Sequence, residues 1–268
     1  MRSSYSFPLA VTCALVAAGC SDNEATAPNV EASSVAALIP SHNTLRNRLR
    51  SIVEEQNGGL GFEMWATILD RDGKVVDVVF SGQRRGDQWP GSRVISAQKA
   101  NTANAFSLEG LALSTANLFA PTQPGGSLFG LQESNPVDPD VAYGGKASDF
   151  GTKKDFMIGK RIGGINVFGG GLGLYTPSGR LIGGVGLSGD TACTDHIIAW
   201  KLRHSLNLDN VPAGVAPGNP PDGTDNIIYK VGSLDGFEHP KCFDTPGQGD
   251  HFTIGTNLPS THEVGPEE

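Results

Sequence analysis

The chain has 268 residues, of which 38% are hydrophobic, so it is long enough to bury one sizeable core. It carries 28 acidic and 20 basic residues, and the resulting net charge of -8 argues against nucleic acid as a partner. We expect one domain over residues 40–210, preceded by N-terminal extensions and followed by a partly irregular C-terminal extension over residues 211–268.

The first twenty residues have the three parts of a secretory signal peptide. Arg2 gives a short basic start, residues 7–18 form an apolar run too short to span a bilayer, and Ala17, Ala18 and Gly19 precede Cys20. Small residues before a cysteine resemble a bacterial lipobox. An ordinary signal peptide with an incidental cysteine is the alternative.

The lipobox interpretation sets the expected fate of the N-terminus. Residues 1–19 would be removed, Cys20 would carry acyl chains that hold the protein to a membrane, and residues 20–39 would be a flexible tether. Ser21 favours the outer membrane, as in lipoproteins generally. We therefore expect a lipid-anchored protein of the bacterial cell envelope that faces the periplasm or the cell surface.

The first part of the domain is predicted to form a helix and then a β-hairpin. Ser41 can cap the helix, and Gly58 with Gly59 can end it. The strands are expected over residues 62–69 and 74–80, because the intervening Asp70-Arg71-Asp72-Gly73 has turn chemistry.

The middle of the chain is predicted to be helical and then irregular. Residues 94–106 form a helix rich in small side chains, which let a neighbouring surface approach closely, either the sheet or a ligand. A second helical piece is expected over residues 108–119. Residues 121–151 form a long loop of the kind that is functional or disordered, and its segment 128–132 is apolar enough to dock back onto the domain.

Residues 163–206 are the most distinctive stretch of the chain. Apolar residues at Ile165, Val167 and over 181–187 predict two strands joined by the turn at 177–179. A glycine corner then leads to an amphipathic helix opened by Asp190 or Thr191, and residues 226–231 can add one more strand. So much glycine places backbone close to a neighbouring element or to a flat ligand.

The order of these elements predicts an α+β fold in which helices cover an antiparallel sheet. Residues 184–189 match G-x-G-x-x-G, but a dinucleotide site needs a parallel βαβ unit, which the order of elements does not provide. The glycines therefore serve a tight corner of the sheet. The free amides at the helix start near Asp190 remain candidates to bind an acidic group such as a propionate.

The cysteines left after processing are Cys193 and Cys242. An even pair in an oxidising compartment predicts a disulfide. Together with His196 and His239 the same cysteines form C-x2-H and H-x2-C pairs, which have zinc-ligand spacing, so a zinc site is the alternative. His196 is the histidine best placed to bind a metal, and no convincing catalytic nucleophile is present, since Ser188 lacks the G-x-S-x-G elbow.

Three segments resemble the GlcG/HbpS family of haem-binding proteins, sometimes described as haem-degrading. They are ATILDRDGKVVDVVFSG (66–82), SAQKANTANAF (96–106) and GGINVFGGGLGLYTPSGRLIGGVGLSGDTACTDHIIA (163–199). The chain departs from the family pattern in the loop 121–151, in Cys193 and in the tail after residue 210.

The resemblance implies a profilin-like α/β/α sandwich around a five-stranded antiparallel sheet, assembly into homo-oligomers, and binding of haem or a related tetrapyrrole. Lys99 and Thr102 match positions of the family's helix, where a threonine has been implicated in haem binding, and Asp195 matches the aspartate of its last helix.

Three functions follow as hypotheses. The leading one is an extracytoplasmic protein, without an assignable catalytic residue, that captures or senses haem. In it the small-residue helix accepts the porphyrin plane, Lys99 or the Asp190 amides hold a propionate, and His196 binds the iron. The alternatives are a haem-degrading enzyme and a structural accessory lipoprotein.

Overall fold

The computed structural model describes residues 35–216, 223–229 and 236–242. The predicted signal peptide, Cys20 and most of the tether lie outside the described residues. The end of the predicted tether forms a short helix, α1 (Val35–Leu38), and Val35 is buried in the core. No helix within the described ranges has the length and apolar character that a membrane crossing requires.

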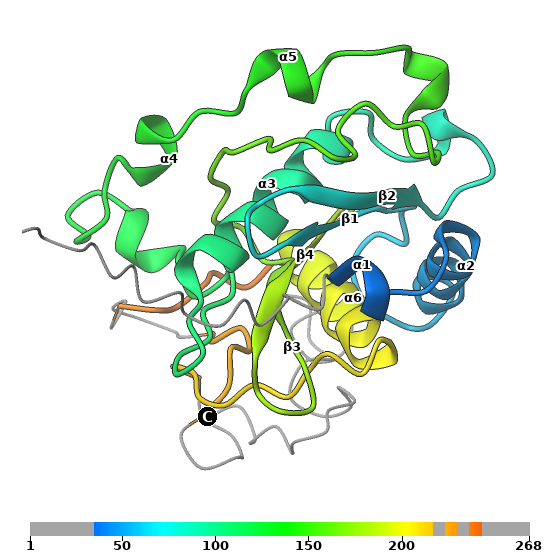
Figure 1. The fold of residues 1–268 in the computed structure, drawn as a ribbon. Helices are drawn as coiled ribbons and strands as arrows, with labels where there is room; N and C mark the ends of the chain where they lie inside the picture. Colours follow the sequence, from blue (N-terminus) through cyan, green and yellow to red (C-terminus); the bar gives the residue numbers. More distant parts are fainter. Residues whose placement is uncertain (1–34, 217–222, 230–235, 243–268) are drawn as a thin grey trace, which may run out of the picture. The chain divides into compact units, whose positions relative to one another are not determined.

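The core of the domain is a four-stranded antiparallel sheet (Figure 1). Its strands lie in the order β2-β1-β4-β3, so the two central strands, β1 and β4, are distant in sequence. Their bounds are β1 (Trp65–Asp70), β2 (Val75–Phe80), β3 (Gly171–Tyr175) and β4 (Leu181–Ser188). The antiparallel α+β prediction is confirmed, whereas the described part of the chain holds four strands and not the expected five.

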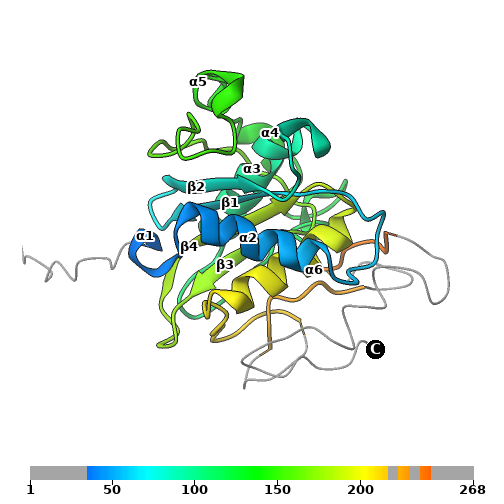
Figure 2. The same cartoon turned by 90° about the vertical axis from the view of Figure 1, so that its right-hand side faces the viewer.

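Helices cover both faces of this sheet. Two helices, α2 (His42–Val53) and α6 (Ala192–Ser205), lie side by side on one face, and α3 (Ser92–Phe106) lies on the other (Figure 2). The predicted cap of α2 is confirmed, because the Ser41 side chain accepts a hydrogen bond from the Thr44 amide. Helices on both faces of one sheet form the α/β/α sandwich that the family resemblance implied.

The register of the sheet separates large side chains from glycines. On the face towards α2 and α6, strand residues such as Ile68, Val185 and Leu187 enter the main apolar core. The opposite face carries two cross-strand glycine pairs, Gly171 with Gly186 and Gly173 with Gly184. This face is therefore nearly flat where α3 crosses it.

Helix α3 lies directly on the glycine face. A Cβ added at Gly186 would clash with the carbonyl oxygen of Ser96, and one added at Gly184 would clash with that of Ala100. Ala97, Ala100 and Ala103 of α3 are completely buried. The glycine-rich strands and the small-residue helix thus pack against each other. Of the two neighbours that the sequence allowed for this face of α3, a sheet or a ligand, the structure has the sheet.

The expected second helix over residues 108–119 is absent from the structure, which has turns there. Side chains compete for the backbone amides: Leu113 donates to Ser107 Oγ at 3.1 Å, and Ser114 donates to Asn117 Oδ1 at 3.0 Å. The amide of Ala112 donates to Ala213 O at 2.8 Å, which ties this segment to the C-terminal extension.

Two expected strands also differ from the structure. Ile165 and Val167 are buried but lie before β3 in irregular backbone, where the Asn166 amide donates to Thr102 Oγ1 at 3.0 Å. A side chain, and not a neighbouring strand, therefore satisfies that amide. Residues 226–229 contain only an isolated bridge between Tyr229 and His239, and residues 230 and 231 lie outside the described residues.

The long loop is ordered by short helices and by a buried ion pair. Its helices are α4 (Leu131–Ser134) and α5 (Pro139–Ala142). 3₁₀ turns occur at its start, Ala120–Thr122, and near its end, Ala147–Asp149, and a further one, Arg85–Asp87, precedes α3. Leu128 and Leu131 pack against a small apolar cluster, which confirms the predicted docking of 128–132. Arg93 in α3 forms a bidentate pair with Asp155 at 2.5 and 2.8 Å, and this pair holds the far end of the loop.

Candidate functional site

Asp190 marks the corner between β4 and α6. Its carboxylate accepts hydrogen bonds from the amides of Leu60 and Phe62, each at 2.9 Å, and from that of Thr191 at 2.7 Å. Thr191, one of the two expected caps, is the N-cap of α6. Asp190 therefore binds backbone of its own chain and is only 8% exposed.

The amides at this corner are also occupied. Those of Gly189 and Asp190 donate to Asp195 Oδ1 at 3.1 and 2.9 Å. A carboxylate in the first turn of α6 fills the position that we expected a ligand propionate to take. Binding of a propionate by these amides stays a prediction, and it requires the Asp195 carboxylate to give up both hydrogen bonds.

Lys99 completes this buried network. Its Nζ lies 2.6 Å from Asp195 Oδ2, and both side chains are almost fully buried. Burial raises the pKa of Asp195 to about 6, while the charge of Lys99 acts in the opposite direction. The ammonium therefore neutralises a buried carboxylate of its own chain and does not face solvent, where a propionate could reach it.

Thr102 is buried in the same helix. Its hydroxyl donates to Gln98 O at 2.8 Å and accepts from the Asn166 amide at 3.0 Å. With 0% exposure it holds the segment before β3 against α3. Both residues that the family resemblance suggested, Lys99 and Thr102, thus have structural partners in the interior.

His196 is fully buried in α6 and makes one hydrogen bond among the described residues. Its Nε2 lies 3.2 Å from Asn226 Oδ1, which also accepts the Ile227 amide, so Nε2 is the protonated nitrogen. Burial, with a contribution from the charge of Arg203, lowers the pKa of His196 to about 3. Binding of iron by His196 stays a prediction, and it requires movement of the residues that bury this side chain.

The predicted disulfide between Cys193 and Cys242 is present. It joins the first turn of α6 to residues 236–242, a segment that we call the C-terminal strap. One ring nitrogen of His239 lies within 4.8 Å of both sulfur atoms. His196 is not a member of this group, so the expected four-residue zinc set is not assembled.

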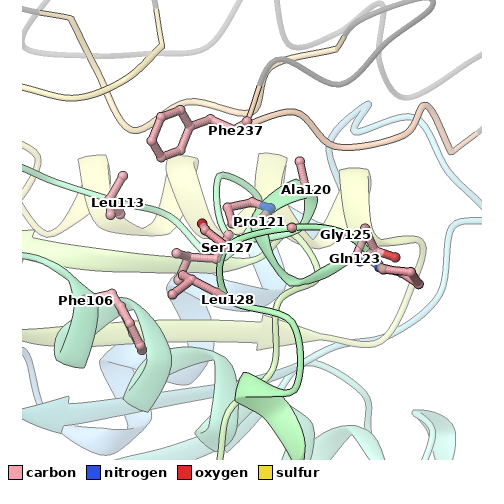
Figure 3. Close-up of a pocket in the computed structure, with 13 residues that line it drawn as sticks. Phe106, Leu113, Ala120, Pro121, Gln123, Gly125, Ser127, Leu128 and Phe237 are labelled. Carbon is pink, nitrogen blue, oxygen red and sulfur yellow. The ribbon is translucent and has the colours of Figure 1, made fainter.

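A pocket with a mainly apolar wall lies beside the end of α3 and is shown in Figure 3. It has a volume of about 640 Å³, within the range of small-molecule sites. Phe106 comes from α3, Leu128 from the long loop and Phe237 from the C-terminal strap. Gln123 and Ser127 supply the polar side chains of the lining.

Backbone hydrogen bonds fix the walls of this pocket. The amide of Leu128 donates to Pro121 O at 2.9 Å, and a Cβ at Gly126 would clash with the same carbonyl, so glycine is required for this close turn. On the other side the amide of Ala120 donates to Glu238 O at 3.2 Å, which attaches the strap. The sequence signals for this site were the Pro/Gly composition of the loop and its apolar segment 128–132, whereas none pointed to Phe237.

The family model described as haem degrading protein HbpS-like matches residues 43–202. A search of the curated proteins finds no match.

Solved structures with a similar fold include protein ORFY of Klebsiella pneumoniae, with 23% identity and a TM-score of 0.40 over 62% of this chain and 90% of that chain. A PduOC:heme complex has 22% identity and a TM-score of 0.44 over 65% and 98%. A double mutant of HbpS from Streptomyces reticuli has 18% identity and a TM-score of 0.33 over 74% and 99%. Because the family match spans more than half of the 268 residues, the chain belongs to the HbpS-like family, whose model is described as haem degrading protein HbpS-like.

Proposed function

We propose that this protein binds haem or a related tetrapyrrole and that it captures or senses haem outside the cytoplasm. The observation that carries the proposal is the match of residues 43–202 to a haem-related family. The apolar pocket beside α3 supports it, because a porphyrin is a large flat apolar body with acidic groups at one edge.

The described lining of the pocket suits the apolar porphyrin ring, but it offers no side chain that binds the iron. Its walls are built from aromatic and aliphatic side chains, and the described residues of its lining include no histidine, cysteine, methionine, tyrosine or charged residue. The ring would therefore be held by burial of apolar surface and not by an iron ligand from the wall. The pocket also uses the loop and the tail in which this chain departs from the family pattern.

Parallel titrations with haemin and with iron-free protoporphyrin test this proposal. We expect both to bind with dissociation constants within about threefold of each other, because the wall supplies no iron ligand. Leu128→Asp should weaken both by roughly tenfold to a hundredfold, since it places a charge in the apolar wall. Leu60→Asp is the matched control, because Leu60 is half exposed and lies outside the pocket.

The possible outcomes show separately whether the protein binds a tetrapyrrole and which part of the chain binds it. A Soret band that does not change with either compound would refute tetrapyrrole binding. A saturable change that His196→Ala abolishes and Leu128→Asp leaves intact would retain the function and move the site to α6.

Degradation of haem is the second candidate, because the family description names it. Opening of the ring requires proton donors and an activated oxidant, and the pocket lining has no titratable side chain to act as an acid or base. Incubation of the haem-loaded protein with a reductant and oxygen distinguishes the two. A stoichiometric Soret decrease with a linear tetrapyrrole product would favour the enzyme.

Location in the cell envelope is part of the proposal and is supported by the signal-peptide pattern before Cys20. Cys20→Ser should shift the protein from the membrane fraction to the soluble fraction. Assembly into homo-oligomers also stays a prediction, and a solution measurement of mass tests it.

A further inference from the structure

The disulfide Cys193–Cys242 forms part of a larger side-chain cluster. The two sulfur atoms and one ring nitrogen of His239 all lie within 4.8 Å of one another. Zinc bound by two thiolates and an imidazole places its two sulfurs about 3.8 Å apart. Once the S–S bond is broken, the sulfurs need to separate by only roughly 2 Å to reach that geometry.

His239 has the form that a metal ligand requires. Its Nδ1 lies 2.7 Å from Pro240 O, so Nδ1 carries a proton, and the same carbonyl can fix the ring orientation. Nε2 is then the ligand nitrogen, and Zn²⁺ would replace the long hydrogen bond of 3.4 Å that Nε2 accepts from the Gly169 amide. An oriented imidazole beside two sulfur atoms is a typical arrangement of a zinc site.

The surroundings of the two cysteines favour thiolates when the disulfide is open. Cys193 lies in the first turn of α6, where the helix dipole stabilises negative charge. The Cys193 amide donates to Cys242 Sγ at 3.1 Å, which also favours an anionic sulfur. Cys242 is partly exposed, so a reductant can reach this end of the bond.

We propose that the cluster has two states: a disulfide when oxidised, and a Zn²⁺ site made by Cys193, His239 and Cys242 when reduced. A dithiol reductant donates two electrons to the S–S bond and is itself converted to a disulfide. The two protein thiols lose two protons as they bind Zn²⁺, and an exogenous water or anion takes the fourth position.

Either state ties the C-terminal strap to α6, whereas the reduced metal-free state does not. The strap also carries Phe237, which lines the apolar pocket. The reduced protein therefore keeps this wall of the pocket attached when zinc is bound. The metal proposal itself does not depend on tetrapyrrole binding.

The experiment uses the purified protein, oxidised or reduced with a dithiol that is then removed. Zn²⁺ is titrated in competition with a chromophoric chelator, and Co²⁺ is used as a spectroscopic probe. We expect one Zn²⁺ per reduced chain, none per oxidised chain, and a thiolate-to-cobalt charge-transfer band in the reduced protein only. Cys242→Ser and His239→Ala should each weaken Zn²⁺ binding by about tenfold or more.

His204→Ala is the matched control, because His204 is also on α6 but pairs with Asp209 at 2.8 Å, away from the cluster. It should leave Zn²⁺ affinity unchanged. Circular dichroism is recorded in each state. A folded reduced protein without the cobalt band, or equal Zn²⁺ affinity in Cys242→Ser, would refute the site. If reduction unfolds the protein, Zn²⁺ must restore the folded spectrum, and failure to do so also refutes it.

Discussion

At the scale of residues, buried charges are paired across long sequence distances. Arg203 in α6 forms a bidentate pair with Asp225 at 2.6 and 2.8 Å, as Arg93 does with Asp155. Such pairs add little net stability when intact, because both charges lose their hydration. Loss of one partner is costly, since the other charge is then buried alone.

Lys99→Met tests whether Lys99 has a structural role or binds a ligand. The substitution leaves the Asp195 carboxylate buried without its cation, so we expect the free energy of unfolding to fall by about 3–5 kcal/mol. Tetrapyrrole affinity of the folded protein should stay within about twofold of wild type, because Lys99 does not line the pocket. Urea denaturation and a haemin titration measure the two quantities.

Arg161→Met is the control for this test. Arg161 lies 3.9 Å from Asp72, and both side chains are largely exposed, so we expect a change within about 0.5 kcal/mol. If Lys99→Met is as stable as wild type but no longer binds haemin, Lys99 binds the ligand and does not have the structural role described above.

At the scale of elements, periodicity and turn chemistry predicted the secondary structure correctly where contacts within a segment determine it. The hairpin of β1 and β2 and the cap of α2 are local in this sense. Residues 108–119 have helical spacing, but Ser107 and Asn117 bind backbone amides there, and the segment pairs with the C-terminal extension. That outcome depends on contacts that no local pattern contains.

The small residues of α3 and the glycines of β3 and β4 were correctly predicted to mark a close approach. The sequence left open whether a sheet or a ligand lies there, because either explains the absence of side chains. The structure places α3 on Gly184 and Gly186. Shape complementarity between two elements, and not composition alone, resolved this alternative.

Gly186→Ala tests the packing of α3 on the sheet. A methyl group there would clash with the backbone of α3 at Ser96, so the helix must move away from the strand. We expect a loss of about 1–3 kcal/mol in the free energy of unfolding, measured by urea denaturation.

Gly91→Ala is the matched substitution, because an added Cβ has open space and the backbone is already α-helical. We expect a change within about 0.5 kcal/mol. Equal stability of Gly186→Ala and Gly91→Ala would contradict the close contact between α3 and β4.

At the scale of the whole molecule, the pocket depends on segments that are more than a hundred residues apart. Phe106 ends a predicted helix, whereas Phe237 lies in a tail with no recognisable pattern. The disulfide that positions this tail was predicted from cysteine counting, but the wall it brings to the pocket was not. Lys99 and His196, which were chosen as site residues for their chemistry, are both buried in the interior.

Acid should destabilise the molecule through the two histidines buried between α6 and the strap. Burial lowers the pKa of His196 to about 3 and of His239 to about 4, against about 6.5 in the unfolded chain. Below pH 6.5 the unfolded chain therefore binds protons that the folded protein excludes, so stability is lost as the pH falls towards those values. Each histidine should lower the free energy of unfolding by about 2 kcal/mol at pH 5 relative to pH 7.

Asp195 acts in the opposite direction, because its pKa is raised to about 6 and its protonation below that pH relieves a buried charge. The contribution of one histidine is therefore isolated by comparing wild type with His196→Gln at both pH values. Glutamine does not titrate, so the stability advantage of wild type over the variant should shrink by about 2 kcal/mol between pH 7 and pH 5. A difference that is the same at both pH values would show that the pKa of His196 is not lowered in the folded protein, which contradicts its burial.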